Sequence, residues 1–247
     1  QESRTARDDL RMDFAQLTAP KMKYFLLNYL TIGGSASNAI NTKSFTDEMS
    51  KRKINYEVLE QTVKALATYL ASPRRPRSED FHKYNSSYLQ LFEIILRSSQ
   101  TVKWSSMDDA KKKQYLTSMY FTKIAICTVC QYYPMMQSHE EVIQLKSFLN
   151  KLLTKRVELL SIEEIIELIV AELSCPHFDI PFTIFLTETA FPRLSQTKRP
   201  ELIALAMKTM GNNPKMFRWK QIDQKPGITQ TKILDPFLDV FMQMLKK

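Results

Sequence analysis

Glycine is scarce in this sequence. Only four glycines occur among the 247 residues, at positions 33, 34, 211 and 227, whereas average usage would give about seventeen. Nucleotide-binding loops of the Rossmann and P-loop types need several glycines at fixed spacing, and these four positions supply neither pattern. Strand-rich folds also use glycine in their turns. The shortage therefore excludes both nucleotide-binding signatures and favours a helical protein.

Cysteine and long apolar runs are also rare. Three cysteines occur, Cys127, Cys130 and Cys175, and an odd count at this density argues against the disulfide framework of a small secreted protein. We therefore expect a reducing intracellular compartment. The longest stretch without a charged side chain covers residues 124–139 and contains a proline. It is too short to span a bilayer.

Apolar residues recur with helical spacing along the chain, most clearly in residues 161–173. Ser161 and Glu164 form the S-x-x-E pattern of a capping box, which satisfies backbone donors in the first turn of a helix. Six apolar residues fall on one predicted helix face: Ile162, Ile165, Ile166, Ile169, Val170 and Leu173. Four acidic residues are predicted to lie off this face: Glu163, Glu164, Glu167 and Glu172.

Helix start and stop signals divide the chain into roughly ten helices. Ser138 and Glu141 repeat the capping-box pattern, Pro134 ends the helix before it, and Gly211 ends a later one. We find no convincing strand-type alternation and expect almost no sheet. The clearest predicted helices cover residues 18–32, 55–71, 88–97, 105–133, 138–159, 161–173, 179–191, 197–210 and 235–245.

We predict an all-α fold in which antiparallel helix pairs stack as a HEAT-like or armadillo-like array. Residues 138–159 with 161–173, and 179–191 with 197–210, form pairs of about 35 residues, a length that suits such repeats. Because no residue-level repeat recurs, an irregular compact α-bundle is the alternative. We expect a single domain over residues 1–247, with 72–80 as an alternative boundary. Since the chain begins with Gln1, we expect a fragment of a longer protein.

Charge is distributed unevenly along the chain, whose net charge is +9. Residues 1–124 carry 20 basic and 13 acidic side chains, residues 138–190 carry 4 and 9, and residues 191–247 carry 11 and 4. Two basic regions therefore flank an acidic one. This asymmetry predicts separate surfaces for partners.

Short basic clusters supply the candidate binding residues. On a stacked array they would line a ridge that follows a phosphate backbone or holds an acidic peptide, although lysines near helix ends also stabilise the helix dipole. Residues 215–220 interleave aromatic and basic side chains, which suits stacking on a base, or equally a core helix with a basic outer face. The candidate partner- or nucleic-acid-binding residues are Arg74, Arg75, Arg77, Lys111, Lys112, Lys113, Lys215, Arg218, Trp219 and Lys220.

The cysteines allow two interpretations. Cys127 and Cys130 form a C-x-x-C pattern, a zinc half-site that Cys175 and His177 would complete, or a redox pair. Their apolar flanks favour the alternative that they pack as small hydrophobic residues in a core helix. We therefore expect no metal and no cofactor.

Catalytic signatures are missing from the sequence. Neither H-E-x-x-H nor G-x-S-x-G occurs, and His82, His139 and His177 stand at no recognisable spacing from a nucleophile. We expect a protein that is not an enzyme.

The 72–80 loop and the carboxy-terminal segment suggest a site of regulation and a site of contact with a partner. Ser78 follows three arginines in the 72–80 loop and resembles a phosphorylation site, and the same arginines resemble a short nuclear-import signal. This favours the nucleus slightly over the cytoplasm. The amphipathic segment 235–247 is expected to cover the core, with a role as a groove ligand or dimer contact as the alternative.

These features predict a non-catalytic scaffold domain of a larger intracellular assembly. A surface of helices would hold a segment of another protein through apolar contacts, with basic residues setting its orientation. The alternative is a helical-repeat domain that binds RNA or DNA through the basic clusters.

Overall fold

The computed structural model describes scattered positions between residues 60 and 79, and then residues 85–100, 102–176, 178–213, 219–221, 230–232 and 235–245. The predicted helix at 18–32 lies outside the described residues. The chain divides into two compact units, an amino-terminal unit (Gln1–Leu153) and a carboxy-terminal unit (Thr154–Lys247). Each is described separately.

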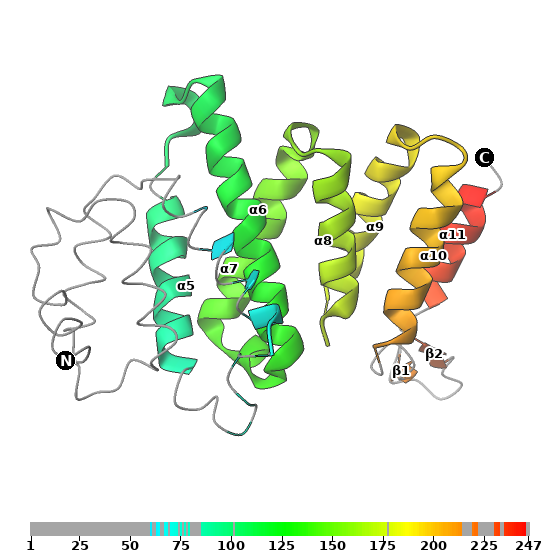
Figure 1. The fold of residues 1–247 in the computed structure, drawn as a ribbon, viewed down its shortest axis with the longest axis horizontal. Helices are drawn as coiled ribbons and strands as arrows, with labels where there is room; N and C mark the ends of the chain where they lie inside the picture. The colour runs from blue at the N-terminus through cyan, green and yellow to red at the C-terminus, as the bar shows by residue number, and fades with distance from the viewer. Residues whose placement is uncertain are drawn as a thin grey trace, which may run out of the picture. The chain divides into compact units, whose positions relative to one another are not determined.

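The amino-terminal unit contains three α-helices and two short 3₁₀ turns among its described residues (Figure 1). Every described position from 60 to 71 is also helical, in agreement with the predicted helix at 55–71. The elements are α5 (Asn85–Gln100), η4 (Trp104–Ser106), α6 (Asp109–Tyr132), η5 (Pro134–Ser138) and α7 (Glu140–Lys155), whose last turn crosses into the next unit.

Among the described residues of this unit, helix α6 contributes the largest number of buried side chains. Asp108 caps it by accepting a hydrogen bond from the Lys111 backbone N–H at 2.8 Å. The helix ends at Tyr132 because Pro134 cannot continue it. It contacts α5 where the Ser99 hydroxyl lies 3.6 Å from the sulfur of Met119. Its buried positions include large apolar residues and both C-x-x-C thiols, so α6 forms much of the core.

The carboxy-terminal unit is built around α8. Helices α8 (Ile162–Ser174) and α9 (Ile180–Ala190) pack together, and α10 (Lys198–Gly211) also packs on α8. Figure 1 shows these helices with their axes roughly aligned. The predicted pairing of 179–191 with 197–210 is therefore not the main packing contact of this unit. Helices α9 and α10 each pack mainly on α8. The remaining elements are η6 (Val157–Leu159), η7 (Phe191–Arg193), β1 (Trp219–Gln221), β2 (Gln230–Lys232) and α11 (Asp235–Leu245).

Hydrogen bonds from side chains to backbone carbonyls connect separate elements of this unit. The Asn213 amide donates hydrogen bonds to the carbonyls of Leu173 and Cys175, at 2.9 and 2.8 Å. These carbonyls lie at the end of α8, where no further turn supplies a donor. The Arg193 guanidinium similarly donates to the carbonyl of Leu160 at 3.0 Å. The three helices are thus joined by polar contacts as well as by apolar packing.

Several predicted helix starts are confirmed. Ser161 and Glu164 form a complete capping box at the start of α8, with distances of 3.1 and 2.9 Å. Asp179 caps α9 by accepting from the Phe182 backbone N–H. The predicted all-α class is confirmed for the described residues, whose only strands are the three-residue β1 and β2. Seven α-helices with defined bounds lie in the described residues; ten helices and repeat stacking stay predictions.

Other local predictions were wrong. The Ser138 hydroxyl donates to the carbonyl of Met135 and does not cap α7. Helix α10 does begin after Thr197, as predicted, although the Thr197 hydroxyl lies 3.1 Å from that of Ser195 and makes no capping hydrogen bond. Glu172 was expected off the apolar face, but it is fully buried, and its carboxylate accepts from the Asp179 backbone N–H at 3.3 Å.

The carboxy-terminal segments also differ in part from expectation. Strands β1 and β2 pair antiparallel, with Trp219 opposite Lys232, so a core helix through residues 215–220 is wrong at its last two positions. Helix α11 exists and buries Phe241, but Met242 is 59% exposed and does not join the buried face. No helix among the described residues is long and apolar enough to cross a membrane.

Candidate partner-binding site

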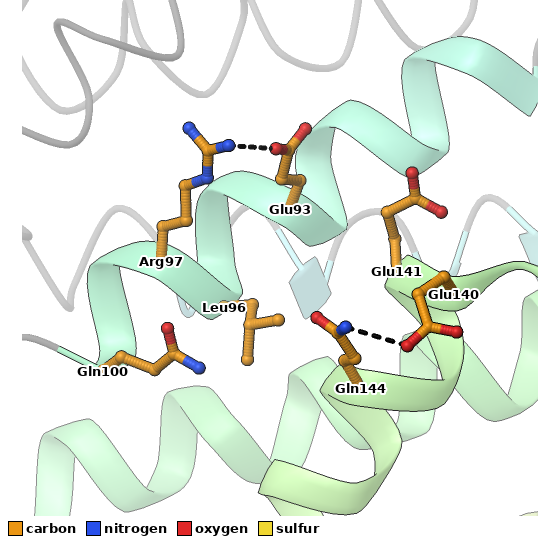
Figure 2. Close-up of a pocket in the computed structure, with 7 residues that line it drawn as sticks. All are labelled: Glu93, Leu96, Arg97, Gln100, Glu140, Glu141 and Gln144. Atoms are coloured by element: carbon orange, nitrogen blue, oxygen red, sulfur yellow. Dashed lines mark hydrogen bonds and ion pairs between the residues drawn. The ribbon is translucent and has the colours of Figure 1, made fainter.

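A cleft of about 320 Å³ lies between α5 and the first turns of α7, within the amino-terminal unit. Figure 2 shows its side chains converging from the two helices. Seven residues line it: Glu93, Leu96, Arg97, Gln100, Glu140, Glu141 and Gln144.

Helical spacing brings the α5 side chains to the cleft. Glu93, Arg97 and Gln100 fall at i, i+4 and i+7, so they share one side of the helix. Leu96 lies beside this row and is nearly buried. It therefore presents an apolar wall among polar groups.

The first turn of α7 supplies the opposite side. Glu140 and Glu141 occupy the start of this helix, where carboxylates interact favourably with the positive end of the helix dipole. Gln144 follows one turn later, and its amide donates to Glu140 Oε1 at 2.8 Å. The start of the helix is thus stabilised by the same groups that line the cleft.

The polar pairs of the cleft stay within their own helices. The Arg97 guanidinium lies 2.6 Å from Glu93 Oε1 on α5, and the Glu140–Gln144 hydrogen bond lies within α7. Among the seven lining residues, none bonds across the cleft. Figure 2 shows the carboxylate of Glu141 directed toward α5. That carboxylate makes no ion pair or hydrogen bond within the described part of the chain.

The charge of the cleft is negative, because three carboxylates face one guanidinium. Like charges that approach one another disfavour closure of the two helices onto each other. A cation placed between Glu93 and Glu141 would remove that repulsion, and its aliphatic stem would contact Leu96. The lining residues include no serine, cysteine or histidine.

The predicted lysine cluster lies in the first turns of α6, and none of its residues lines the cleft. Lys111 is 66% exposed and its ammonium lies 3.9 Å from Asp108. The Lys112 ammonium lies 5.6 Å from the centre of the Trp104 ring. Lys113 is exposed. Since Asp108 and Asp109 stand in the same turn, acidic groups offset part of the positive charge.

Among the predicted arginines, Arg75 lies far from these lysines. The Arg75 guanidinium stacks 3.7 Å from the centre of the Tyr132 ring, and it also donates to the Ser72 carbonyl at 3.2 Å. Lys112 and Tyr132 are twenty residues apart on α6, or about 30 Å at 1.5 Å per residue. Arg77 is exposed. The structure therefore does not bring the lysine and arginine clusters together.

The remaining predicted residues allow little comparison. Trp219 and Lys220 belong to β1. Arg74, Ser78, Lys215 and Arg218 lie outside the described residues, as do His82 and His177.

All three cysteines are buried and none forms a disulfide, which confirms the core packing predicted for Cys127 and Cys130. Cys127 and Cys130 are fixed in the buried side of α6, and Cys175 follows α8. Among the described residues, no three His, Cys, Asp or Glu side chains group as a metal site requires. His139, at the start of α7, does not line the cleft.

The residues that line the cleft were not among the predicted binding residues. Glu140 and Glu141 are visible as first-turn acids, and Glu93 with Arg97 as an ordinary i, i+4 pair. Both patterns are typical of solvated helix faces. Only the packing of α5 beside α7 turns them into one site, and no local spacing contains that information.

The chain matches no protein-family model, and neither a curated protein nor a solved structure is significantly similar to it. The proposals below therefore depend on the geometry.

Proposed function

We propose that this chain is a non-catalytic protein-interaction domain that holds a basic segment of a partner protein within a larger assembly. The observation that supports this is the α5–α7 cleft, in which carboxylates from two helices flank an apolar side chain and make no bond across the cleft. The prediction of a protein-binding scaffold is thereby made more specific, and the expected acidic partner is replaced by a basic one.

The chemistry of the cleft suits a lysine or arginine side chain. Its cationic end would lie between Glu93 and Glu141, while its methylene groups would lie on Leu96. Gln100 and Gln144 add side-chain amides, which would accept hydrogen bonds from the N–H groups of a peptide backbone and donate hydrogen bonds to its carbonyls. A segment with one or two basic residues beside an apolar residue fits this set best.

Binding of a fluorescent peptide tests the proposal. The probe is a helical Lys- and Leu-containing peptide, compared with its Glu-for-Lys counterpart, and anisotropy reports affinity. We expect the basic peptide to bind and the acidic one not to. The double variant Glu93→Gln with Glu141→Gln should weaken binding by about tenfold, because it removes attraction at two positions.

The matched control makes the same charge change elsewhere. Glu163→Gln with Glu167→Gln alters two exposed carboxylates of α8, in the other unit. We expect this variant to bind as the unchanged protein does. Equal loss in both double variants would mean that general charge attraction, not the cleft, holds the peptide. Such a result would contradict the proposal.

Nucleic-acid binding is the second candidate, and the exposed lysines at the start of α6 favour it. Two contacts oppose it. The half-buried Trp104 ring already has the Lys112 ammonium 5.6 Å from its centre and the Tyr115 ring centre 6.1 Å away, and a stacked base would have to displace these neighbours. A salt-series mobility shift with single-stranded RNA decides: affinity falling steeply with salt, and falling further in Lys111→Gln with Lys113→Gln, would support this candidate.

A further inference from the structure

The carboxylates of the α5–α7 cleft are partly occupied by neighbours on their own helices. The Oε1 atom of Glu93 lies against the Arg97 guanidinium, and the Oε1 atom of Glu140 accepts from the Gln144 amide. The Glu141 carboxylate accepts no bond from the residues that the structure describes. Of the six oxygens on these three carboxylates, two are therefore in use and four remain as acceptors.

This set of acceptors suits the ammonium group of lysine better than the guanidinium of arginine. A guanidinium binds a carboxylate most strongly when its planar fork meets both oxygens of one group. Only Glu141 keeps both oxygens for such a contact, because Glu93 and Glu140 each have one oxygen engaged. An ammonium carries three donors and can contact a single oxygen on each of several carboxylates.

The lining of the cleft lacks the groups that would recognise a modified lysine. The seven described lining residues include no aromatic ring, so a methylated ammonium would find no aromatic cage. Trimethyl-lysine keeps its charge but has no N–H donor for the carboxylates. Acetyl-lysine has lost the charge, and the carbonyl oxygen of its amide would face the carboxylate oxygens. Both modifications therefore remove interactions that the cleft offers to an ammonium.

We propose that the cleft recognises one unmodified lysine of the partner segment, and that acetylation of this lysine prevents binding. This inference rests on the proposed function, because it requires a basic segment in the cleft. The ammonium would lie among the carboxylates of Glu93, Glu140 and Glu141, with the lysine methylenes on the nearly buried Leu96. The modification state of a single partner lysine would thereby control assembly.

Fluorescence anisotropy with four forms of one helical peptide tests the inference. The peptide has a single basic position flanked by leucines, which is occupied by lysine, arginine, trimethyl-lysine or acetyl-lysine. We expect the lysine form to bind most tightly, and the arginine and trimethyl-lysine forms to bind about threefold more weakly. The acetyl-lysine form should bind about tenfold more weakly or less. Low ionic strength is used, because salt screens exposed ion pairs.

A single substitution connects this preference to the cleft. Glu141→Gln keeps the size of the side chain and removes its charge, so affinity for the lysine form should fall by about threefold. Affinity for the acetyl-lysine form should stay the same. Glu167→Gln, at an exposed carboxylate of α8 in the other unit, is the matched control and should change neither affinity. Circular dichroism should show the same helix content in both variants.

The outcomes separate this inference from the proposed function. Equal binding of the lysine and arginine forms, with weaker binding of the acetyl-lysine form, would overturn lysine recognition but leave a general site for basic segments. Trimethyl-lysine that binds as tightly as lysine would mean that the cleft responds to charge alone, and would also overturn this inference. Equal binding of the lysine and acetyl-lysine forms, or no binding of any form, would overturn both proposals.

Discussion

The polar side chains of the cleft and those of the α8–α10 region make different kinds of contact. In the cleft, Glu93 bonds to Arg97 and Glu140 bonds to Gln144, so each pair lies within one helix and is exposed. In the carboxy-terminal unit, Asn213 after α10 bonds to the backbone at the end of α8 and is buried. Polar side chains in the cleft thus bond within one exposed helix, whereas Asn213 bonds between two elements in a buried place.

This difference indicates which polar groups hold the fold. A buried amide that donates to carbonyls of another element satisfies acceptors that would otherwise lose their hydrogen bonds to water. An exposed pair within one helix contributes only a few tenths of a kcal/mol, about 0.3–0.5. Removing the first kind should cost stability, and removing the second kind should change only binding. Three variants, two single and one double, test this contrast, from the largest expected effect to the smallest.

Asn213→Ala should have the largest effect. It leaves the carbonyls of Leu173 and Cys175 without their donor in a buried place, so we expect the free energy of unfolding to fall by about 3 kcal/mol. Urea unfolding followed by circular dichroism measures it. Asn212→Ala, at the exposed neighbour, should change stability by less than about 0.5 kcal/mol. Equal losses of stability at both positions would mean that the buried Asn213 hydrogen bonds do not hold the fold.

Ser161→Ala should have an intermediate effect. It removes the side-chain acceptor for the Glu164 backbone N–H, and loss of such a cap costs about 1 kcal/mol. Ser138→Ala is the matched control, because its hydroxyl contacts only the exposed Met135 carbonyl and caps no helix. Its effect should remain under about 0.5 kcal/mol. A larger loss from Ser138→Ala than from Ser161→Ala would contradict this ranking.

Glu93→Gln with Glu141→Gln should have the smallest effect on stability. Neutralising Glu93 loses an exposed ion pair, while the repulsion across the cleft also falls, so the free energy of unfolding should change by less than about 0.5 kcal/mol. The same urea experiment measures it. A loss above about 1.5 kcal/mol would mean that these carboxylates support the fold, contrary to the role proposed for them.

Sequence patterns predicted the local features of this fold well. Helix starts at Ser161 and Asp179 follow from side chains that satisfy donors three residues away, whereas the long helix begins after Asp108 and not at the predicted residue 105. Such contacts depend only on residues close in the sequence. The same reasoning predicted the helical class and the burial of Cys127 and Cys130, because both follow from apolar spacing along single helices.

Features that depend on packing between elements were not predictable in this way. Glu172 occupies a position that helical spacing assigns to the polar side, yet it is buried because α9 begins against it. Met242 falls on the apolar side of α11 but is exposed. The cleft combines α5 with α7, about forty-five residues apart, and neither helix alone distinguishes its residues from an ordinary solvated face.

The position of Asn213 has a practical consequence for anyone expressing the carboxy-terminal unit alone. It stands two residues past the last residue of α10, while the carbonyls that it binds lie 38 and 40 residues earlier in the chain. A recombinant fragment that ends at Gly211, the last residue of α10, would keep every helical turn of α8, α9 and α10. It would lose the two Asn213 hydrogen bonds that join the end of α10 to the end of α8. The cloning boundary should therefore be placed after residue 213.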